Sequence, residues 1–419
     1  MENKFNKLFF YYLILLFFFS IIYLYSKHDV ANDSTISEWL INYSGGFTKR
    51  GLIGQICILI ANFLNTNLRD VILIFQILLI GLYFILLFKF INNIKINKVI
   101  ILSIFTPIFI LYPLAEIEVL ARKEVFIFCI FITYLFIKSY QIKNIYKLIF
   151  LPIAILIWEP VIFYFLFFLA IDSFENNYEK LDKRFTLNLF YYLPAIVIAS
   201  YIVLNPMTLQ EHELMSNYLN NNFSEICYMS CALLKSKSSI YDQFYWNYNK
   251  YSFEVFLRYF LIILFGFGPL ILLIKNSSLK NPNSIFFKSF KNLLYPVAIM
   301  LSPVLLLFAM GYDWGRWVNI SYVFTIIFYF YLYKEKKIIL NLKFLDNKII
   351  NLLKNKKIFI ITVIIFCFGW NPKTVMTGDV ATNPLWKIPY NSSKIIFGFK
   401  NFRILQETPL SKWHKKYFE

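Results

Sequence analysis

Long apolar blocks alternate with short polar segments along this chain. The first block covers residues 8–26 and contains no charged side chain. A run of about 18 or more apolar residues is long enough to cross a bilayer as a helix. The blocks lack the period-2 alternation of barrel strands, and only helices and closed barrels satisfy their backbone groups in lipid. The pattern therefore predicts an all-α, polytopic integral membrane protein.

We expect about eleven spans, at residues 8–26, 71–90, 99–114, 124–139, 148–158, 160–171, 187–204, 253–274, 293–311, 318–333 and 357–371. Residues 51–64 form a shorter apolar stretch, which we interpret as a juxtamembrane or re-entrant helix in the first outer loop. Residues 148–171 are interrupted by Trp158-Glu159-Pro160. Because proline removes a backbone donor and glutamate is costly in lipid, we expect two short helices that meet at a polar elbow.

Composition and charge support this class. The chain is 59% hydrophobic and only 16% charged, whereas soluble domains are about a quarter charged. The net charge of +18 is spread between the spans rather than over one face, so we expect no nucleic-acid partner. With the N-terminus inside, the expected cytoplasmic segments hold 23 Lys and Arg, against 11 in the outer segments before residue 372. This bias follows the positive-inside rule.

The same topology divides the chain into a transmembrane domain, residues 1–371, and an extracytoplasmic C-terminal tail, residues 372–419. The expected outer loops are residues 27–70, 115–123, 205–252 and 312–317. Three cysteines, Cys57, Cys129 and Cys367, lie in apolar segments and are expected to behave as small hydrophobes. Cys227 and Cys231 lie in the long outer loop, where an oxidising compartment would favour a disulfide. Two free thiols are the alternative.

The first outer loop carries acids and a basic pair directly after the first span: Asp29, Asp33, Glu38, Lys49 and Arg50. A carboxylate at the membrane surface can take a proton from an attacking hydroxyl, and nearby cations can hold a phosphate leaving group. These residue types therefore suit a reaction on a lipid-linked phosphate. The alternative is an ordinary polar loop, with Trp39 and Tyr43 as anchors at the membrane interface.

A second group of charges crowds the expected turn at residues 115–123 and its border: Glu116, Glu118, Arg122, Lys123 and Glu124. Glu116 and Glu118 are candidate ligands for a divalent metal such as Mg²⁺ or Mn²⁺, or partners for Arg122. A helix cap held by ion pairs is the alternative. Glu159 is a candidate because carboxylates within a membrane are usually functional, although glutamate next to proline also suits a helix start.

The fourth group follows the span at 293–311 and reads Asp313-Trp314-Gly315-Arg316-Trp317. The planar fork of arginine suits phosphate, and Trp314 or Trp317 can stack on a sugar ring. An ion pair between Asp313 and Arg316 beneath an aromatic belt is the alternative.

The order of these spans and loops resembles that of the GT-C superfamily of membrane glycosyltransferases. The resemblance covers roughly residues 1–275 and lies in the architecture more than in the amino-acid sequence. In that family one span precedes a long outer loop with a catalytic acid, which Asp33 matches best and Asp29 second. Arg122-Lys123-Glu124 stands at the family's tight outer turn, and Glu159-Pro160 between its two short helices. Asp29-x-x-x-Asp33 is looser than the acidic signature of many members. Residues 45–52 and 313–317 are also similar to motifs of bacterial multi-spanning proteins that bring no established chemistry.

The resemblance implies transfer of a sugar from a polyprenyl-phosphate donor to a glycan, lipid or protein acceptor, at the outer face of a bacterial inner membrane. Asp33 would be the base or would orient the acceptor hydroxyl. Arg122, Lys123 and Arg316, together with Lys49 and Arg50, would hold the donor phosphate. An O-antigen or capsule polymerase that relies on Arg258 and Arg316 is one alternative, and a flippase or transporter of lipid-linked glycans is another. The sugar and the acceptor stay open.

Overall fold

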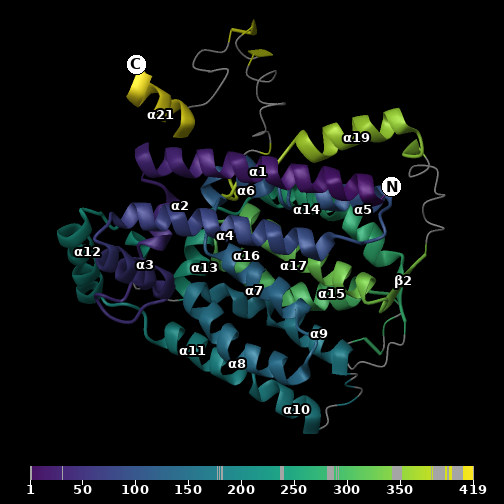
Figure 1. Ribbon diagram of the computed structural model, residues 1–419, viewed down its shortest axis with the longest axis horizontal. Coiled ribbons are helices and arrows are strands. Elements are labelled where there is room, and N and C mark those ends of the chain that lie inside the picture. The colour runs from purple at the N-terminus through teal and green to yellow at the C-terminus, as the bar shows by residue number, and fades with distance from the viewer. Residues whose placement is uncertain are drawn as a thin grey trace. The chain divides into compact units, whose positions relative to one another are not determined.

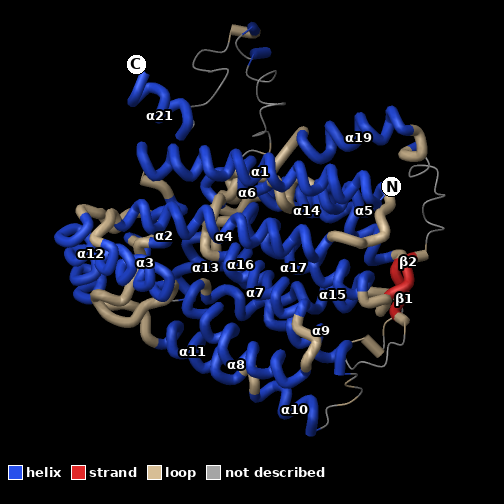
Figure 2. The backbone as a smooth tube through the Cα atoms, viewed as in Figure 1, coloured by secondary structure: helices blue, strands red, loops and turns tan. Residues whose placement is uncertain are grey.

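The structure is a computed structural model, and it describes residues 2–30, 32–176, 178, 180, 183–235, 240–280, 287–288, 290, 292–341, 352–378, 380, 392–393, 396–398 and 409–418. These residues are mostly helical, as the sequence predicts (Figure 2). Strands within the described ranges form one short antiparallel pair, β1 (Ser277–Leu279) with β2 (Ile338–Leu340).

Helices in the first part of the chain, with η for 3-10 helices, are α1 (Glu2–Val30), α2 (Ser34–Trp39), α3 (Gly51–Leu64), α4 (Leu68–Ile91), α5 (Lys98–Phe105), α6 (Tyr112–Ala115), η1 (Ile117–Val119), α7 (Glu124–Phe136), α8 (Tyr140–Ile157), η2 (Glu159–Tyr164) and α9 (Phe165–Asn176). The later helices are α10 (Lys183–Phe190), α11 (Leu193–Leu204), α12 (Leu209–Phe223), η3 (Ala232–Lys235), α13 (Ile240–Tyr248), α14 (Phe253–Lys275), α15 (Leu294–Leu301), η4 (Ser302–Val304), α16 (Leu305–Met310), α17 (Trp314–Lys334), α19 (Lys356–Phe368) and α21 (Pro409–Phe418). Figure 1 labels them where there is room.

Four described helices are long and apolar enough to cross a membrane: the Asn3–Asp29 part of α1, and α4, α8 and α14. A fifth candidate is the pair α10 and α11, which meet at an angle of 46°. Shorter apolar helices lie at Gly51–Leu64, Glu124–Phe136 and Leu294–Met310. A helical membrane protein is therefore supported, while the number of eleven crossings rests on the sequence pattern.

Prolines explain where the expected spans break. The block at 99–114 is helical only to Phe105, because Thr106 precedes Pro107 and a residue before proline disfavours the helical conformation. In the block at 293–311 the chain tightens at Ser302-Pro303 into η4. The elbow expected at residues 158–160 is present, since α8 ends at Ile157 and η2 begins at Glu159.

The chain divides into two compact units, which we describe separately. Unit 1 comprises residues 1–10, 91–117 and 243–408, and unit 2 comprises residues 11–90, 118–242 and 409–419. The expected C-terminal tail is thus shared: residues 372–378 belong to unit 1 and α21 belongs to unit 2. The division expected at residue 371 concerns the side of the membrane and stays a prediction.

The core of unit 1 is α17, in which every residue from Trp314 to Leu332 is buried. Helix α14 packs against both α5 and α17. The polar side chains of α17 find backbone partners, which removes the cost of burying them. Asn319 donates to the carbonyls of Ile108 and Phe109, and the Tyr322 hydroxyl donates to the carbonyl of Ser103.

Unit 2 is organised around α8, which contacts α3, α7, α11 and η2. A buried carboxylate on α9, Asp172, joins α7, α8, α10 and the start of α11. It accepts hydrogen bonds from Lys147 at 2.7 Å, Tyr192 at 2.8 Å and Asn188 at 3.0 Å, and it is also bonded to Tyr134. Because each of these polar groups has a hydrogen-bond partner, we interpret the network as one that stabilises the packing of α7 and α11.

Candidate functional site

Four charged side chains from four separate segments of unit 2 are linked by a continuous series of ion pairs. Arg122 Nε lies 3.0 Å from one oxygen of Glu38, and Arg50 Nη1 lies 3.2 Å from the other. Arg50 also donates two hydrogen bonds of 2.8 Å to the two oxygens of Glu159. Two more cations, Lys49 and Lys123, interact electrostatically with Glu159. We call these six residues the ionic cluster: Glu38, Lys49, Arg50, Arg122, Lys123 and Glu159.

Short local structures bring these residues together. Glu38 lies on α2, and the indole of Trp39, one residue on, donates a 3.0 Å hydrogen bond to the carbonyl of Ala121. This bond fixes α2 against the turn that carries Arg122. Arg50 immediately precedes α3, and Glu159 opens η2 at the proline elbow. The loop, turn and elbow singled out by the sequence thus converge within unit 2.

The backbone beside the cations is strained. Arg50 has φ +63° and Ala121, just before Arg122, has φ +57°. A non-glycine residue in this left-handed region costs roughly 1–2 kcal/mol and persists where surrounding contacts fix it. Strain of this kind is common at functional sites. At Arg50 the side chain pairs with Glu38 and Glu159, and the backbone carbonyl accepts a hydrogen bond from Lys123.

The glycines of residues 45–54 let three backbones approach closely. A side chain at Gly45 would place its Cβ 1.9 Å from the carbonyl oxygen of Glu211, at the start of α12. A Cβ at Gly54 would lie 2.0 Å from the carbonyl oxygen of Ile41. Gly46 has φ +139°, which only glycine adopts readily. The motif at 45–52 therefore positions Lys49 and Arg50 by tight packing.

Cations outnumber carboxylates in the ionic cluster by four to two. Glu38 and Lys123 are fully buried, Arg122 nearly so, and the other three are half-buried. Burial lowers the pKa of Lys123 to about 8, and Glu38 acts against this shift. Burial also lowers the pKa of Lys49, opposed by Glu159. Burial alone would raise the pKa of Glu159, but Arg50 and Lys49 hold it below its ordinary value.

Lys49 and Lys123 have hydrogen-bond donors that the cluster itself does not use. The Lys123 ammonium donates to the carbonyl of Arg50. Lys49 makes no hydrogen bond or close ion pair with any residue in the described ranges. An ammonium carries three donors, so both side chains have hydrogen-bonding capacity for an anion.

Asp33, the expected catalytic acid, lies at the start of α2 and is largely engaged. One oxygen accepts from the amide and hydroxyl of Thr35, at 2.7 and 2.6 Å, and the other lies 3.0 Å from the ammonium of Lys27. Burial alone would raise the pKa of Asp33, but Lys27 and Thr35 outweigh it and hold the pKa below its ordinary value. A carboxylate in this state is a weak base. Lys27, for which the sequence pattern indicated no role, also interacts with Glu118 and Arg122.

Other expected site residues lie elsewhere. Asp29 accepts hydrogen bonds from Lys416, at 2.9 Å, and Tyr417, at 2.8 Å, both on α21. It therefore belongs to a contact within unit 2 that no local sequence pattern predicts. Glu124 is buried at the start of α7.

Glu118 is exposed on η1 in unit 2, and unit 1 holds the remaining candidates. Arg316 is buried and lies 3.5 Å from the partly exposed Asp313. The Trp314 indole donates to the carbonyl of Phe308 and packs among aromatic rings, as a core side chain does. Glu116 pairs at 3.4 Å with Lys373, a residue for which the sequence pattern indicated no role. The metal expected at Glu116 and Glu118 stays a prediction.

The disulfide expected between Cys227 and Cys231 is formed, and His212 lies against it. Apart from this bridge, Cys57, Cys129 and Cys367 are free and buried, as expected for cysteines in apolar helices.

No protein-family model, no curated protein and no solved structure matches this chain.

Proposed function

We propose that this protein is a membrane glycosyltransferase of GT-C type, which moves a sugar from a polyprenyl-phosphate donor to a glycan, lipid or protein acceptor. The observation that carries the proposal is the charge balance of the ionic cluster. Four cations share two carboxylates in a poorly solvated place. An uncompensated buried charge is costly, so the cluster favours an added anion. The phosphodiester of such a donor brings one negative charge, which becomes two as the sugar leaves and polyprenyl phosphate is released, and it brings the acceptor oxygens that these donors need.

Within this proposal Lys49, Lys123 and Arg122 contact the donor phosphate. Arg50, held by Glu38 and Glu159, positions them and adds positive charge. Stabilising the departing phosphate is an electrostatic task, for which preorganised cations are suited. Asp33 fits the task of orienting the acceptor hydroxyl better than that of removing its proton, because its pKa is low. The polyprenyl chain would lie along apolar helix surfaces at the outer face of a bacterial inner membrane.

Binding of the lipid phosphate tests the proposal without knowledge of the sugar. Purified protein in detergent would be titrated with a long-chain polyprenyl phosphate and, separately, with the matching polyprenol, and bound lipid measured by native mass spectrometry. We expect Lys49→Gln to weaken phosphate binding about tenfold or more, the worth of one charge-assisted hydrogen bond, and to leave polyprenol binding unchanged. Lys4→Gln, an exposed lysine on α1, is the matched control.

Equal binding of the two lipids, or phosphate binding that Lys49→Gln leaves intact, would contradict the proposal. Transfer itself would be followed with a panel of polyprenyl-phosphate sugars and isolated membranes. Asp33→Asn should abolish transfer while lipid binding persists. A protein that binds the lipid phosphate but transfers no sugar from any donor would favour the transporter alternative.

One observation keeps that alternative in view. Broken helices are typical of transporters, and unit 2 has two breaks, between α8 and η2 and between α10 and α11. A lipid-linked glycan would then be carried unchanged to the other face of vesicles that contain the protein. The polymerase alternative predicts instead that Arg316→Ala abolishes chain extension while Lys49→Gln does not.

A further inference from the structure

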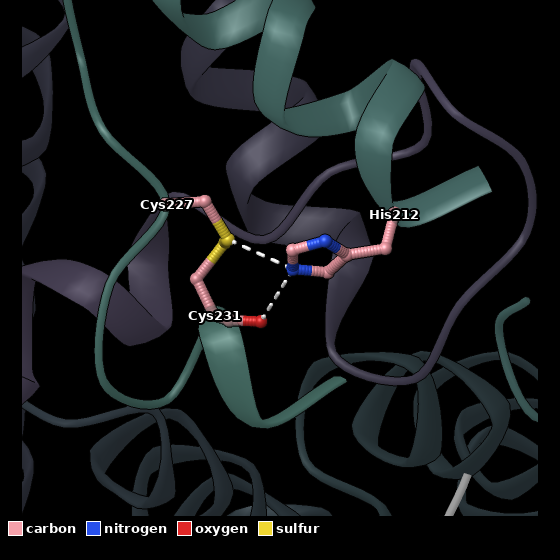
Figure 3. Close-up of side chains that lie close together, drawn as sticks. All are labelled: His212, Cys227 and Cys231. Atoms are coloured by element: carbon pink, nitrogen blue, oxygen red, sulfur yellow. Dashed lines mark hydrogen bonds between the residues drawn. A yellow bond between two sulfur atoms is a disulfide. The ribbon is translucent and has the colours of Figure 1, made fainter. Parts of the chain in front are cut away.

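A histidine and two cysteines meet in the outer loop of unit 2, apart from the ionic cluster. His212 projects from the first turn of α12 toward the bridge between Cys227 and Cys231 (Figure 3). Its Nε2 atom lies 3.3 Å from the sulfur of Cys227 and 3.3 Å from the carbonyl oxygen of Cys231. His212 and Cys231 are buried, and Cys227 is half-buried.

The spacing of these atoms fits a zinc site. Zinc binds thiolate at about 2.3 Å and imidazole at about 2.0 Å, so a tetrahedral site places its nitrogen and sulfur roughly 3.5 Å apart and two sulfurs roughly 3.8 Å apart. Nε2 and both sulfurs already lie within 4.8 Å of one another. The Cys-x-x-x-Cys spacing also falls in the range of zinc sites. Only the bond between the sulfurs keeps them too close.

Contacts outside the bridge hold the three residues in place. The capping box of Thr208 and Glu211 fixes the first turn of α12, which carries His212. Glu225, just before Cys227, pairs with Arg69, and the amide of Ser230 donates a 3.2 Å hydrogen bond to the hydroxyl of Ser37. None of these contacts uses a sulfur atom. The ligand atoms therefore stay within reach of one another when the bridge opens.

We propose that His212, Cys227 and Cys231 form a zinc site in the reduced protein. The disulfide then cross-links this loop in the oxidised protein, and the metal ion does so in the reduced protein. A dithiol reduces the bridge, which gives two cysteine thiols and the oxidised dithiol. Zn²⁺ then binds both sulfurs with release of their two protons. Nε2 of His212 is the third ligand, with the ring proton on Nδ1, and water completes the tetrahedron. The site is independent of the function proposed above.

Metal binding to the full-length protein tests the inference. Protein in detergent would be reduced with a dithiol, freed of it by gel filtration under argon, and titrated with Co²⁺ and then Zn²⁺. We expect one metal per chain in the reduced protein and none in the oxidised protein, with a thiolate-to-cobalt absorption band that Zn²⁺ removes. X-ray absorption of the zinc form should show two sulfur neighbours and one imidazole.

Variants separate this site from the three other thiols. Cys227→Ser with Cys231→Ser should abolish binding, although Cys57, Cys129 and Cys367 remain. His212→Gln should weaken binding by more than about tenfold, since loss of an outer-shell partner alone costs about 10–100-fold. Gel-filtration profiles show whether each variant keeps its fold. The proposal fails if the reduced wild type binds no metal, if the oxidised protein binds equally, or if folded His212→Gln binds as tightly as the wild type.

Discussion

The guanidinium of Arg50 donates hydrogen bonds of 2.8 Å to both carboxylate oxygens of Glu159, a residue 109 positions further along the chain. This paired geometry is the one for which arginine is suited and lysine is not. It joins the start of α3 to the elbow between α8 and η2. The ionic cluster thus depends on a contact between two segments that are each irregular in backbone conformation.

We expect Glu159→Gln to lower the thermal unfolding midpoint of the detergent-solubilised protein. The substitution removes a charge that three cations share, and loss of a largely buried partner costs about 1–3 kcal/mol. Glu254→Gln is the matched control, because Glu254 is 79% exposed in its pair with Arg258 and such pairs contribute about 0–1 kcal/mol. Equal shifts for the two variants would show that the Arg50 pair has no special weight.

Gly45→Ala tests the packing of the motif at 45–52. Its new Cβ would lie 1.9 Å from the backbone oxygen of Glu211, so either the loop or α12 must move. Overpacking of this kind costs about 1–3 kcal/mol, and displacement of the loop should also weaken binding of polyprenyl phosphate. Gly268→Ala, where no atom lies within 4 Å of the new methyl group, should leave both properties unchanged or raise stability slightly. Unfolding midpoints and lipid binding are measured for both variants. If Gly45→Ala changed neither property, the close approach of Gly45 to the backbone of Glu211 would be refuted.

A double-mutant cycle measures the coupling between Lys27 and Asp33. Both lie in a poorly solvated place, with side chains 1% and 14% exposed. Asp33→Asn keeps an N-cap side chain for α2 but leaves Lys27 without its 3.0 Å carboxylate, so stability should fall. Adding Lys27→Met should recover part of the loss, with a coupling of about 0.5–3 kcal/mol in the free energy of unfolding. Additive effects would mean that the two charges do not interact.

The sequence located the segments of the site but not their pairing. The helix at 51–64 and the elbow at Glu159-Pro160 follow from apolar length and from proline chemistry, which are local properties. That Glu38 lies between Arg50 and Arg122 depends on how three segments pack, and no local pattern encodes it. The break at Thr106-Pro107 was predictable from the sequence, since Thr106, the residue before the proline, leaves the helical region. Ser302, the residue before Pro303, keeps helical dihedral angles, and the chain only tightens there into η4.

The sequence pattern did not indicate a role for Lys27 or His212, for two different reasons. Lys27 stands in the last turn of the first apolar helix, where a lysine is ordinarily an interface residue, and only the fold shows that it is buried against Asp33. His212 lies 15 residues before Cys227, and a scattered histidine has no fixed spacing that would join it to the bridge. Asp29 was the second candidate for the catalytic acid after Asp33, and no local pattern predicts that α21 supplies its partners.

The lowered pKa of Lys123 leads to a prediction of how lipid binding and protein stability change with pH. Burial lowers its pKa from 10.5 to about 8, so above pH 8 the folded protein loses the ammonium that the phosphate needs. A phosphate monoester keeps its charge in that range, because its second pKa is about 6. Affinity for polyprenyl phosphate should therefore fall as pH rises through 8. Lys123→Arg stays charged and should show a weaker dependence on pH than the wild type, with Lys49, whose pKa burial also lowers, responsible for what remains.

The stability of the folded protein should rise with pH over the range in which the affinity for polyprenyl phosphate falls. Between pH 8 and 10.5 the unfolded chain binds a proton at Lys123 that the folded chain has released, so the free energy of unfolding rises with pH relative to Lys123→Met. Below pH 8 both states are protonated and the folded protein carries the full cost of the buried charge. Denaturant midpoints and lipid titrations at matched pH values measure the two trends together. Affinity that stays level across pH 8 in the wild type would exclude Lys123 from the phosphate site.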